Sequence, residues 1–168
     1  SCVIAPGEPI VLPPGAGRVD EEAELVAVIG RPCRNASPRE AAGCVFGYTC
    51  GNDVSARVWQ KNDLTWWRAK GSDTFAPLGP FLVTGLVPAD LTVIGRVNGR
   101  EVQRCSPRDL FFDVPDLVSW ISRSIALEPG DLVYTGTSGS PAELADGDVV
   151  EVEIGGIGVL RNPVHAGV

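Results

Sequence analysis

The sequence predicts a mainly β, α+β domain, and three observations lead to that fold class. Apolar strand-like runs outnumber helical patterns, and only one stretch has a convincing helical period. Turn-forming residues, 20 Gly and 14 Pro, are spread along the chain instead of being gathered in a linker. A chain of 168 residues with 44% hydrophobic residues is long enough for one domain with a real core. We therefore expect a single domain over residues 1–168.

The first clear strand lies in the stretch from Glu22 to Gly30, in which Glu22 and Glu24 stand at the start of an apolar run. Side chains two positions apart in a strand share a face, so Glu22 and Glu24 should point the same way. Two neighbouring carboxylates repel each other unless a cation lies between them. On this segment alone, a solvated strand end in an acidic protein remains the alternative interpretation.

A short helix is expected next, over residues 37–42. Ser37 can cap it, Pro38 suits its first turn, and Glu40 completes a capping box. The apolar run over residues 44–48 then predicts another strand, which leads directly into a polar segment.

The second half of the chain adds a hairpin, a helix and a strand. Asn98-Gly99 favours a type I′ turn and predicts a β-hairpin over residues 96–102. The one convincing helix spans residues 115–127, and its apolar stripe consists of Leu117, Val118, Ile121 and Ile125. Strict alternation over residues 148–154 predicts a strand whose inward side chains are Val150, Val152 and Ile154.

Composition excludes several classes of partner. The net charge of −7 argues against a nucleic-acid partner and against an anionic membrane surface. No apolar run approaches the roughly 20 residues that cross a bilayer, and no signal peptide is visible. The five cysteines contain no C-x-x-C pair, so we expect mostly buried free thiols of a cytoplasmic protein, with a zinc cluster or a disulfide framework as the alternative.

Carboxylates supply the strongest chemical signal. Asp53 follows the apolar run over residues 44–48 and could complete an oxygen-only site with Glu22 and Glu24. Three carboxylates without a nearby histidine or cysteine pair favour a hard cation, Mg²⁺ or Mn²⁺.

Two later segments carry weaker signals. Lys70 and Thr74 place a cation and a hydroxyl four residues apart on a loop, although a surface lysine is the usual interpretation. Residues 135–140 could offer backbone N–H groups to a carboxylate or oxyanion, with an ordinary turn as the alternative. They do not form a phosphate loop, because the Gly-Lys-Ser/Thr ending is missing.

Together these segments resemble the C-terminal catalytic domain of the fumarylacetoacetate hydrolase family, along nearly the whole chain. The motifs that carry the resemblance include Glu22-Ala23-Glu24-Leu25, Gly47-Tyr48-Thr49, Asn52-Asp53-Val54-Ser55-Ala56-Arg57, Ala69-Lys70 through Thr74-Phe75, Pro77-Leu78-Gly79-Pro80, Val97-Asn98-Gly99, Gly130-Asp131 and Thr135-Gly136-Thr137. Segments this numerous and in this order are specific as a set.

The resemblance implies a β-sandwich-like roll with a few short helices, usually a homodimer, that holds Mg²⁺ or Mn²⁺. It assigns three groups of residues to the site. The metal ligands would be Glu22, Glu24 and Asp53; the catalytic pair beside the metal would be Lys70 and Thr74; the substrate contacts would be Arg57, Gln60 and Thr137.

The resemblance also implies a small oxo acid as substrate, including intermediates of aromatic-ring degradation. We expect metal-dependent hydrolysis of a C–C bond, of the acylpyruvate or fumarylpyruvate type. A decarboxylase or isomerase of oxaloacetate or of ring-cleavage products is the alternative. A non-catalytic member that binds a metal and a dicarboxylate is a third.

This sequence departs from the family pattern in its general base. The usual base is a histidine in a His-x-x-Glu helix upstream, whereas the only histidine here, His165, is expected in a frayed tail. Because the chain contains no methionine, we expect a natural segment ahead of Ser1 to carry the base. Smaller departures are Glu21, Val58 and Ser138, which stand where an aromatic residue, Asp and Pro are usual.

Overall fold

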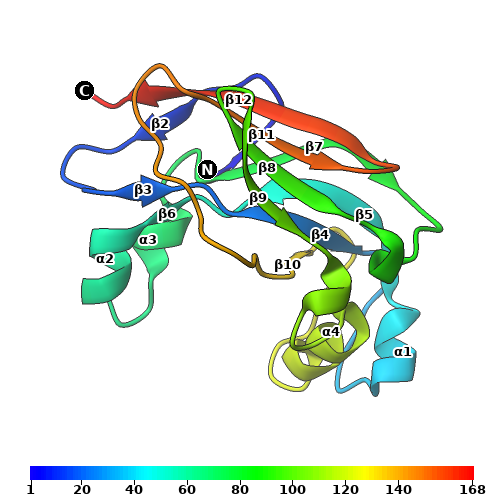
Figure 1. Cartoon of the computed structure of the whole chain (residues 1–168). Coiled ribbons are helices and arrows are strands. Elements are labelled where there is room, and N and C mark those ends of the chain that lie inside the picture. Colours follow the sequence, from blue (N-terminus) through cyan, green and yellow to red (C-terminus); the bar gives the residue numbers. More distant parts are fainter.

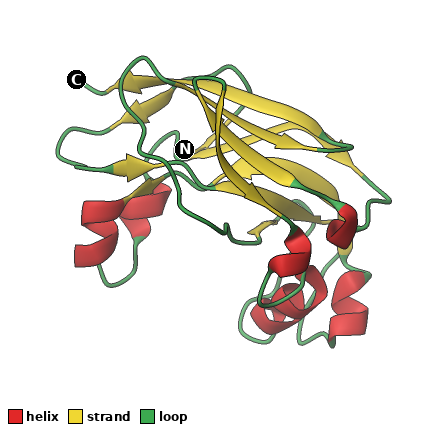
Figure 2. Cartoon of the chain, in the orientation of Figure 1, coloured by secondary structure: helices red, strands yellow, loops and turns green.

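The computed structural model describes residues 1–168, and two five-stranded sheets dominate it (Figure 1; Figure 2). In spatial order, the first sheet consists of β1 (Val3–Ile4), β7 (Ala76–Val83), β5 (Val45–Asn52), β4 (Ala23–Ile29) and β10 (Leu132–Tyr134). The second sheet consists of β2 (Ile10–Leu12), β12 (Gly158–Ala166), β11 (Val149–Ile154), β8 (Val93–Val97) and β9 (Arg100–Cys105). A separate two-stranded sheet joins β3 (Val19–Asp20) to β6 (Ser55–Ala56).

Short helices lie at two ends of the first sheet (Figure 1). At one end, α1 (Pro38–Ala42) packs against α4 (Val114–Ser122). At the other end, α2 (Arg57–Asn62) and α3 (Trp67–Gly71) lie together beside β6. Single 3₁₀ turns, η1 (Pro88–Asp90) and η2 (Pro107–Asp109), complete the helical elements. None of the helices combines the length and the apolar character that crossing a membrane would require.

Apolar side chains between the two sheets bring β4 against the second sheet. Ala23 and Leu25 of β4 are buried together with Val93 of β8 and Val152 of β11. Gly95 permits the close approach, because a Cβ there would lie 3.2 Å from the Cβ of Ala23. This contact fixes the end of β4 from which the two glutamates project.

Local signals at turns and caps are confirmed. Ser37 and Glu40 form the expected capping box at the start of α1. Asn98 and Gly99 both have positive φ, 52° and 76°, as a type I′ turn between β8 and β9 requires. The inward residues of β11 are buried as expected.

The helix expected over residues 115–127 is shorter than predicted. It begins at Val114, which Asp113 caps, and ends at Ser122. The hydroxyl of Ser122 donates a hydrogen bond of 2.8 Å to the carbonyl of Ser119 and so competes with helical bonding. Ile125 consequently lies beyond the helix and is 61% exposed, so its place in the apolar stripe is wrong.

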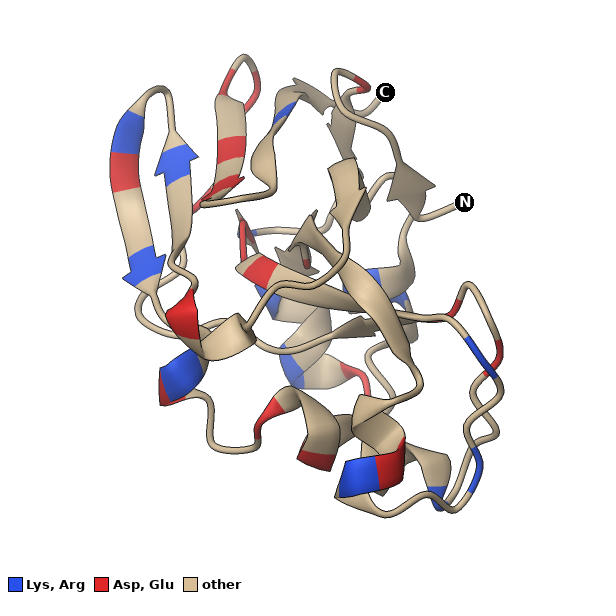
Figure 3. Cartoon of the chain, turned by 90° about the vertical axis from the view of Figure 1, so that its right-hand side faces the viewer, with Lys and Arg blue, Asp and Glu red and all other residues tan.

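Charged residues of both signs are spread over most of the elements of the chain (Figure 3). The hairpin of β8 and β9 illustrates this, since Arg104 pairs with Glu101 and Arg96 pairs with Glu153 of β11. The structure thus has the mainly β fold with few helices that the sequence predicts.

Candidate metal centre

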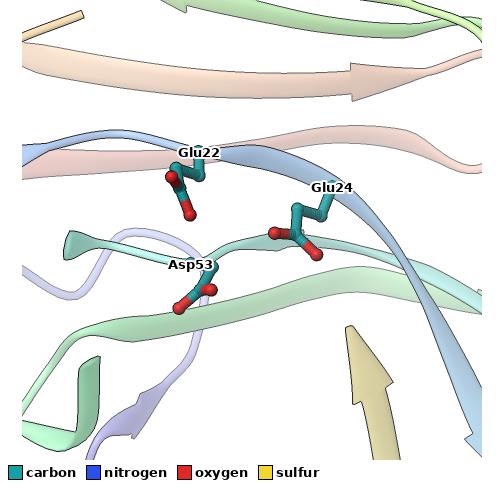
Figure 4. Close-up of side chains that lie close together, drawn as sticks. All are labelled: Glu22, Glu24 and Asp53. Atoms are coloured by element: carbon teal, nitrogen blue, oxygen red, sulfur yellow. The ribbon is translucent and has the colours of Figure 1, made fainter. Parts of the chain in front are cut away.

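Glu22, Glu24 and Asp53 converge at one end of the β4–β5 pair (Figure 4). One carboxylate oxygen from each lies within 4.8 Å of the others. The strand register explains the convergence, because Ala23 lies opposite Asn52 and Asp53 is therefore level with Glu22. The backbone N–H of Asp53 donates a 3.0 Å hydrogen bond to the carbonyl of Glu22, which ties the two segments together.

Asn52 reinforces this junction from the adjacent position. Its side-chain oxygen accepts a 2.9 Å hydrogen bond from the backbone N–H of Glu22. Asn52 is 1% exposed, so the bond is shielded from water. The two chain segments that carry the carboxylates are therefore fixed by backbone and side-chain bonds before any ion is considered.

Lys70, at the end of α3, reaches the cluster from the other side. Its ammonium nitrogen lies 2.8 Å from Oε2 of Glu22 and also forms an ion pair with Asp53. Burial alone would lower the pKa of Lys70, but the carboxylates of Asp53 and Glu22 outweigh it and raise that pKa. Lys70 is thus a charged, half-buried member of the cluster and not a solvated surface lysine.

Arg57 and Gln60 border the same cluster from α2. The Arg57 guanidinium donates to Glu22 at 2.7 Å, to Asp20 at 2.8 Å and to the side-chain oxygen of Gln60 at 2.9 Å. These three bonds hold the guanidinium in one orientation beside Glu22. The partner Asp20, on β3, is 3% exposed and did not stand out in the sequence.

The loop after β10 supplies a further contact. The backbone N–H of Gly136 donates a 2.7 Å hydrogen bond to Oε2 of Glu24. Of the N–H groups in residues 135–140 that could bind a carboxylate, that of Gly136 therefore binds one of the protein's own. The hydroxyl of Thr137 donates to the carbonyl of Ala23 at 2.9 Å, so this loop follows the strand that bears both glutamates.

Thr74 lies just beyond α3, with a φ of 70°. Its hydroxyl accepts a 2.8 Å hydrogen bond from the backbone N–H of Val11 on β2, a strand of the second sheet. A role for Thr74 beside a metal stays a prediction.

His165 belongs to β12 and lies opposite Val11 of β2, with an exposed side chain. The expectation of a frayed tail at this position is therefore wrong. Alternation along β12 turns Val164 inward and His165 toward solvent.

Burial raises the pKa of two carboxylates in the acidic cluster. Burial, assisted by the charge of Asp53, raises the pKa of Glu24 to about 8. Burial also raises the pKa of Asp53, although Lys70 opposes the shift. An all-oxygen donor set of buried carboxylates suits a hard divalent cation, whose charge would favour their ionised forms. The residues present therefore fit Mg²⁺ or Mn²⁺.

The sequence did not point to Gln103, whose side chain contacts Ala23 between the two glutamates. Gln103 follows charged and exposed residues on β9, and no motif marks it. Only the packing of the second sheet against β4 brings Gln103 close to the segment that carries Glu22 and Glu24.

Comparison with known proteins identifies a common family. A model of the domain described as fumarylacetoacetate (FAA) hydrolase C-terminal matches residues 1–165. A mitochondrial oxaloacetate tautomerase of Xenopus laevis is 42% identical over 176 residues, covering 98% of this chain and 55% of the relative.

Solved structures show the same fold. A 5-carboxymethyl-2-hydroxymuconate delta-isomerase from Mycobacterium smegmatis superposes with a TM-score of 0.97 at 46% identity, covering 99% of this chain and 66% of that one. A maleylpyruvate hydrolase from Sphingobium sp. SYK-6, in complex with manganese(II) and pyruvate, has a TM-score of 0.91 at 33% identity, covering 100% and 62%. This chain thus spans between about half and two thirds of the length of these relatives.

Proposed function

The chain belongs to the fumarylacetoacetate hydrolase family, and from that premise we propose that it cleaves a C–C bond in a small oxo acid with Mg²⁺ or Mn²⁺. The observation that carries the proposal is the convergence of Glu22, Glu24 and Asp53, two of which pair with the Lys70 ammonium. The family comprises enzymes, among them hydrolases, isomerases and a tautomerase. The relative with maleylpyruvate hydrolase activity in its name binds manganese(II), which supports the same class of cofactor here.

In this proposal, Glu22, Glu24 and Asp53 would hold the cation. Bound there, it would supply Lewis-acid polarisation of the substrate's carbonyl oxygen. Gly136 keeps the Glu24 carboxylate turned toward the cluster, because its N–H bonds one of the two oxygens. Asp20 and Gln60 hold Arg57 in place, so that its side chain forms one wall of the site.

Lys70 would act on the charge that develops in the substrate. Cleavage of a bond next to a carbonyl leaves negative charge on the carbonyl oxygen. A fixed ammonium near that oxygen stabilises the charge in a water-poor site. Since the carboxylates raise its pKa, Lys70 stays protonated at neutral pH and can take this role.

Isomerisation or tautomerisation is the second candidate. Relatives named as an isomerase and as an oxaloacetate tautomerase match this chain at 46% and 42% identity. Both reactions draw on the same stabilisation of an enolate-like oxygen, whereas hydrolysis additionally needs a base that activates water.

The experiment follows three substrates with metal-stripped protein and with protein reloaded with Mg²⁺ or Mn²⁺. An acylpyruvate and maleylpyruvate report hydrolysis through the pyruvate released, and enol-oxaloacetate reports tautomerisation through its ultraviolet absorbance. We expect metal-dependent release of pyruvate. Tautomerisation without release of pyruvate would favour the second candidate, and no metal-dependent turnover of any substrate would refute both.

Asp53→Asn links the activity to the cluster. Removing one charge from the proposed ligand set should weaken metal binding, measured by titration calorimetry. Asp90→Asn is the matched control, because Asp90 is an exposed carboxylate paired with Arg108 away from the cluster. Equal metal affinity in the two variants would show that Asp53 is not a ligand.

A further inference from the structure

Gln103 is a buried amide that the proposed reaction does not use. It is 4% exposed and is the only buried residue of β9. Its strand belongs to the second sheet, whereas the metal-binding carboxylates project from the first. A buried amide needs partners, because an unpaired polar group inside a protein is costly.

All of its amide bonds run to the site. The side-chain oxygen of Gln103 accepts a 3.0 Å hydrogen bond from the backbone N–H of Ala23. The side-chain nitrogen donates at 3.0 Å to the Thr137 hydroxyl and at 2.9 Å to the carbonyl of Ser138. Ala23 is the residue between Glu22 and Glu24. The Gln103 side chain therefore joins the segment that carries both glutamates to the loop after β10.

The Thr137 hydroxyl closes this arrangement into a ring. It accepts from Gln103 and donates to the carbonyl of Ala23, so both polar groups of Ala23 are engaged. The residue before it, Gly136, donates its N–H to Glu24. Displacing the loop by losing Gln103 would therefore also move the N–H that orients Glu24.

We propose that Gln103 is a positioning residue that sets the geometry of Glu22 and Glu24 by clamping Ala23 and the Thr137 loop together. The proposal rests on the proposed metal-binding role of the two glutamates. Gln103 does not touch the cation or the substrate. It acts through the segment that carries Glu22 and Glu24, and through the loop whose Gly136 N–H binds Glu24.

The first test measures metal binding without turnover. Gln103→Met keeps the length of the side chain and removes its hydrogen bonds. Free Mn²⁺, followed by electron paramagnetic resonance in a titration of the protein, gives the affinity directly. We expect binding about 10–100-fold weaker than in the unmodified protein, the usual effect of removing a group that orients a ligand.

Asn162→Leu is the matched control for a loss of stability alone. Asn162 is also a buried amide of the second sheet, on β12, and it is 1% exposed. Its side chain donates at 2.9 Å to the carbonyls of Ala5 and Glu8 and not to the site. This variant should lower the melting temperature and keep its Mn²⁺ affinity within about twofold, since no ligand-orienting group changes.

A second pair of variants tests the clamp itself. Thr137→Val removes the hydroxyl at nearly constant volume and should weaken Mn²⁺ binding about two- to tenfold, the effect of one hydrogen bond. Since both substitutions open the same ring, the double variant should bind no more weakly than Gln103→Met. Two independent effects would multiply instead, and that result would overturn the proposed clamping by Gln103.

Thr137→Val also serves alone if Gln103→Met does not fold. Unchanged Mn²⁺ affinity of Thr137→Val would then refute the proposal.

Glu24→Gln separates this proposal from the proposed function. If Glu24→Gln weakens Mn²⁺ binding and Gln103→Met leaves it within twofold, the positioning role is wrong and the metal site stands. If neither substitution weakens binding, the metal site itself is wrong.

Discussion

Lys70 lies at the end of α3 and not on the loop that the sequence suggested. A lysine is ordinarily solvated, yet this one pairs with both Glu22 and Asp53, as its assignment beside the carboxylates requires. The uncharged variant Lys70→Met should lower kcat/KM by one to three orders of magnitude, about 1.4–4 kcal/mol of transition-state stabilisation. Steady-state kinetics on the best substrate measure this, with Lys61→Met of α2 as a control that removes a lysine with no ion pair to the cluster. Normal turnover of the Lys70 variant would remove the residue from the mechanism.

His165, unlike Lys70, is expected to contribute nothing to catalysis. Its side chain is exposed on β12, and no hydrogen bond or ion pair ties it to the carboxylates. His165→Gln should therefore retain kcat/KM within about twofold, because a group outside the site contributes nothing to transition-state stabilisation. A loss of tenfold or more would make this histidine a participant in proton transfer and would contradict its assignment to the surface.

Individual site residues differ in how far the sequence could predict them. Glu22, Glu24 and Asp53 follow from strand periodicity and from the chemistry of carboxylates, and the structure brings them together. Gln103 could not be found in this way, because its relevance depends on which residues of β9 face β4 across two sheets. Periodicity places side chains on a face but does not say what lies opposite that face.

At the scale of elements, β5 must pass close to its neighbours to deliver Asp53. Gly51 lies opposite Glu24, and a Cβ there would lie 2.6 Å from Cε1 of Tyr134 and closer still to Val26. Gly51→Ala should therefore destabilise the protein by about 1–3 kcal/mol through overpacking. That corresponds to a melting temperature lower by roughly 2–12 °C in a chain of this size.

Gly155→Ala is the control for this prediction. Gly155 lies in the turn between β11 and β12, where an added Cβ meets nothing within 4 Å. Its melting temperature should stay close to that of the unmodified protein in a thermal scan. Equal shifts for both alanine variants would show that β5 can move to accommodate a side chain at position 51.

Elements with local signals were the easiest to predict. The capping box of α1 and the Asn98-Gly99 turn depend on contacts within a few residues, so local sequence patterns predict them. The end of α4 depends instead on Ser122, whose hydroxyl also accepts from the distant backbone N–H of Ala36. A pattern of apolar residues contains no information about that contact, and the predicted helix was too long.

At the scale of the whole molecule, the two sheets enclose a carboxyl group. Glu21 is fully buried, and its Oε1 accepts a 3.0 Å hydrogen bond from the backbone N–H of Ala142. Its other oxygen has no hydrogen-bond partner and faces Gly95 of the second sheet. Burial raises the pKa of Glu21 to about 7. The interior therefore favours the protonated form of this side chain.

This shift predicts a stability that depends on pH. Because the pKa of Glu21 is higher in the folded state, the folded protein binds the proton more tightly. The contribution is complete below the unfolded pKa of 4.5 and is lost as the pH rises through about 7. The free energy of unfolding should fall by up to about 3 kcal/mol between pH 5 and pH 8 from this group.

Urea unfolding of the metal-free protein at several pH values measures the effect. Glu21→Gln removes the titrating group and keeps the shape, so its stability should depend less on pH than that of the unmodified protein. Glu24, whose pKa is raised to about 8, contributes with the same sign in both proteins and cancels in the difference. A constant difference between the two proteins from pH 5 to pH 8 would contradict the buried, protonated Glu21.

The pairing of β2 with β12 also has a consequence for synthesis of the chain. Ile10, Val11 and Leu12 lie beside Val164, His165 and Ala166, so an early strand finds its only neighbour near the other end of the sequence. On the ribosome, β2 must wait for β12 for roughly 8–30 seconds at ordinary rates of translation. Throughout that interval the nascent chain carries an unpaired strand that other nascent chains can contact. Closure of the second sheet therefore follows synthesis of β12, and slowing the codons just before β12 should increase aggregation more than slowing those before β2.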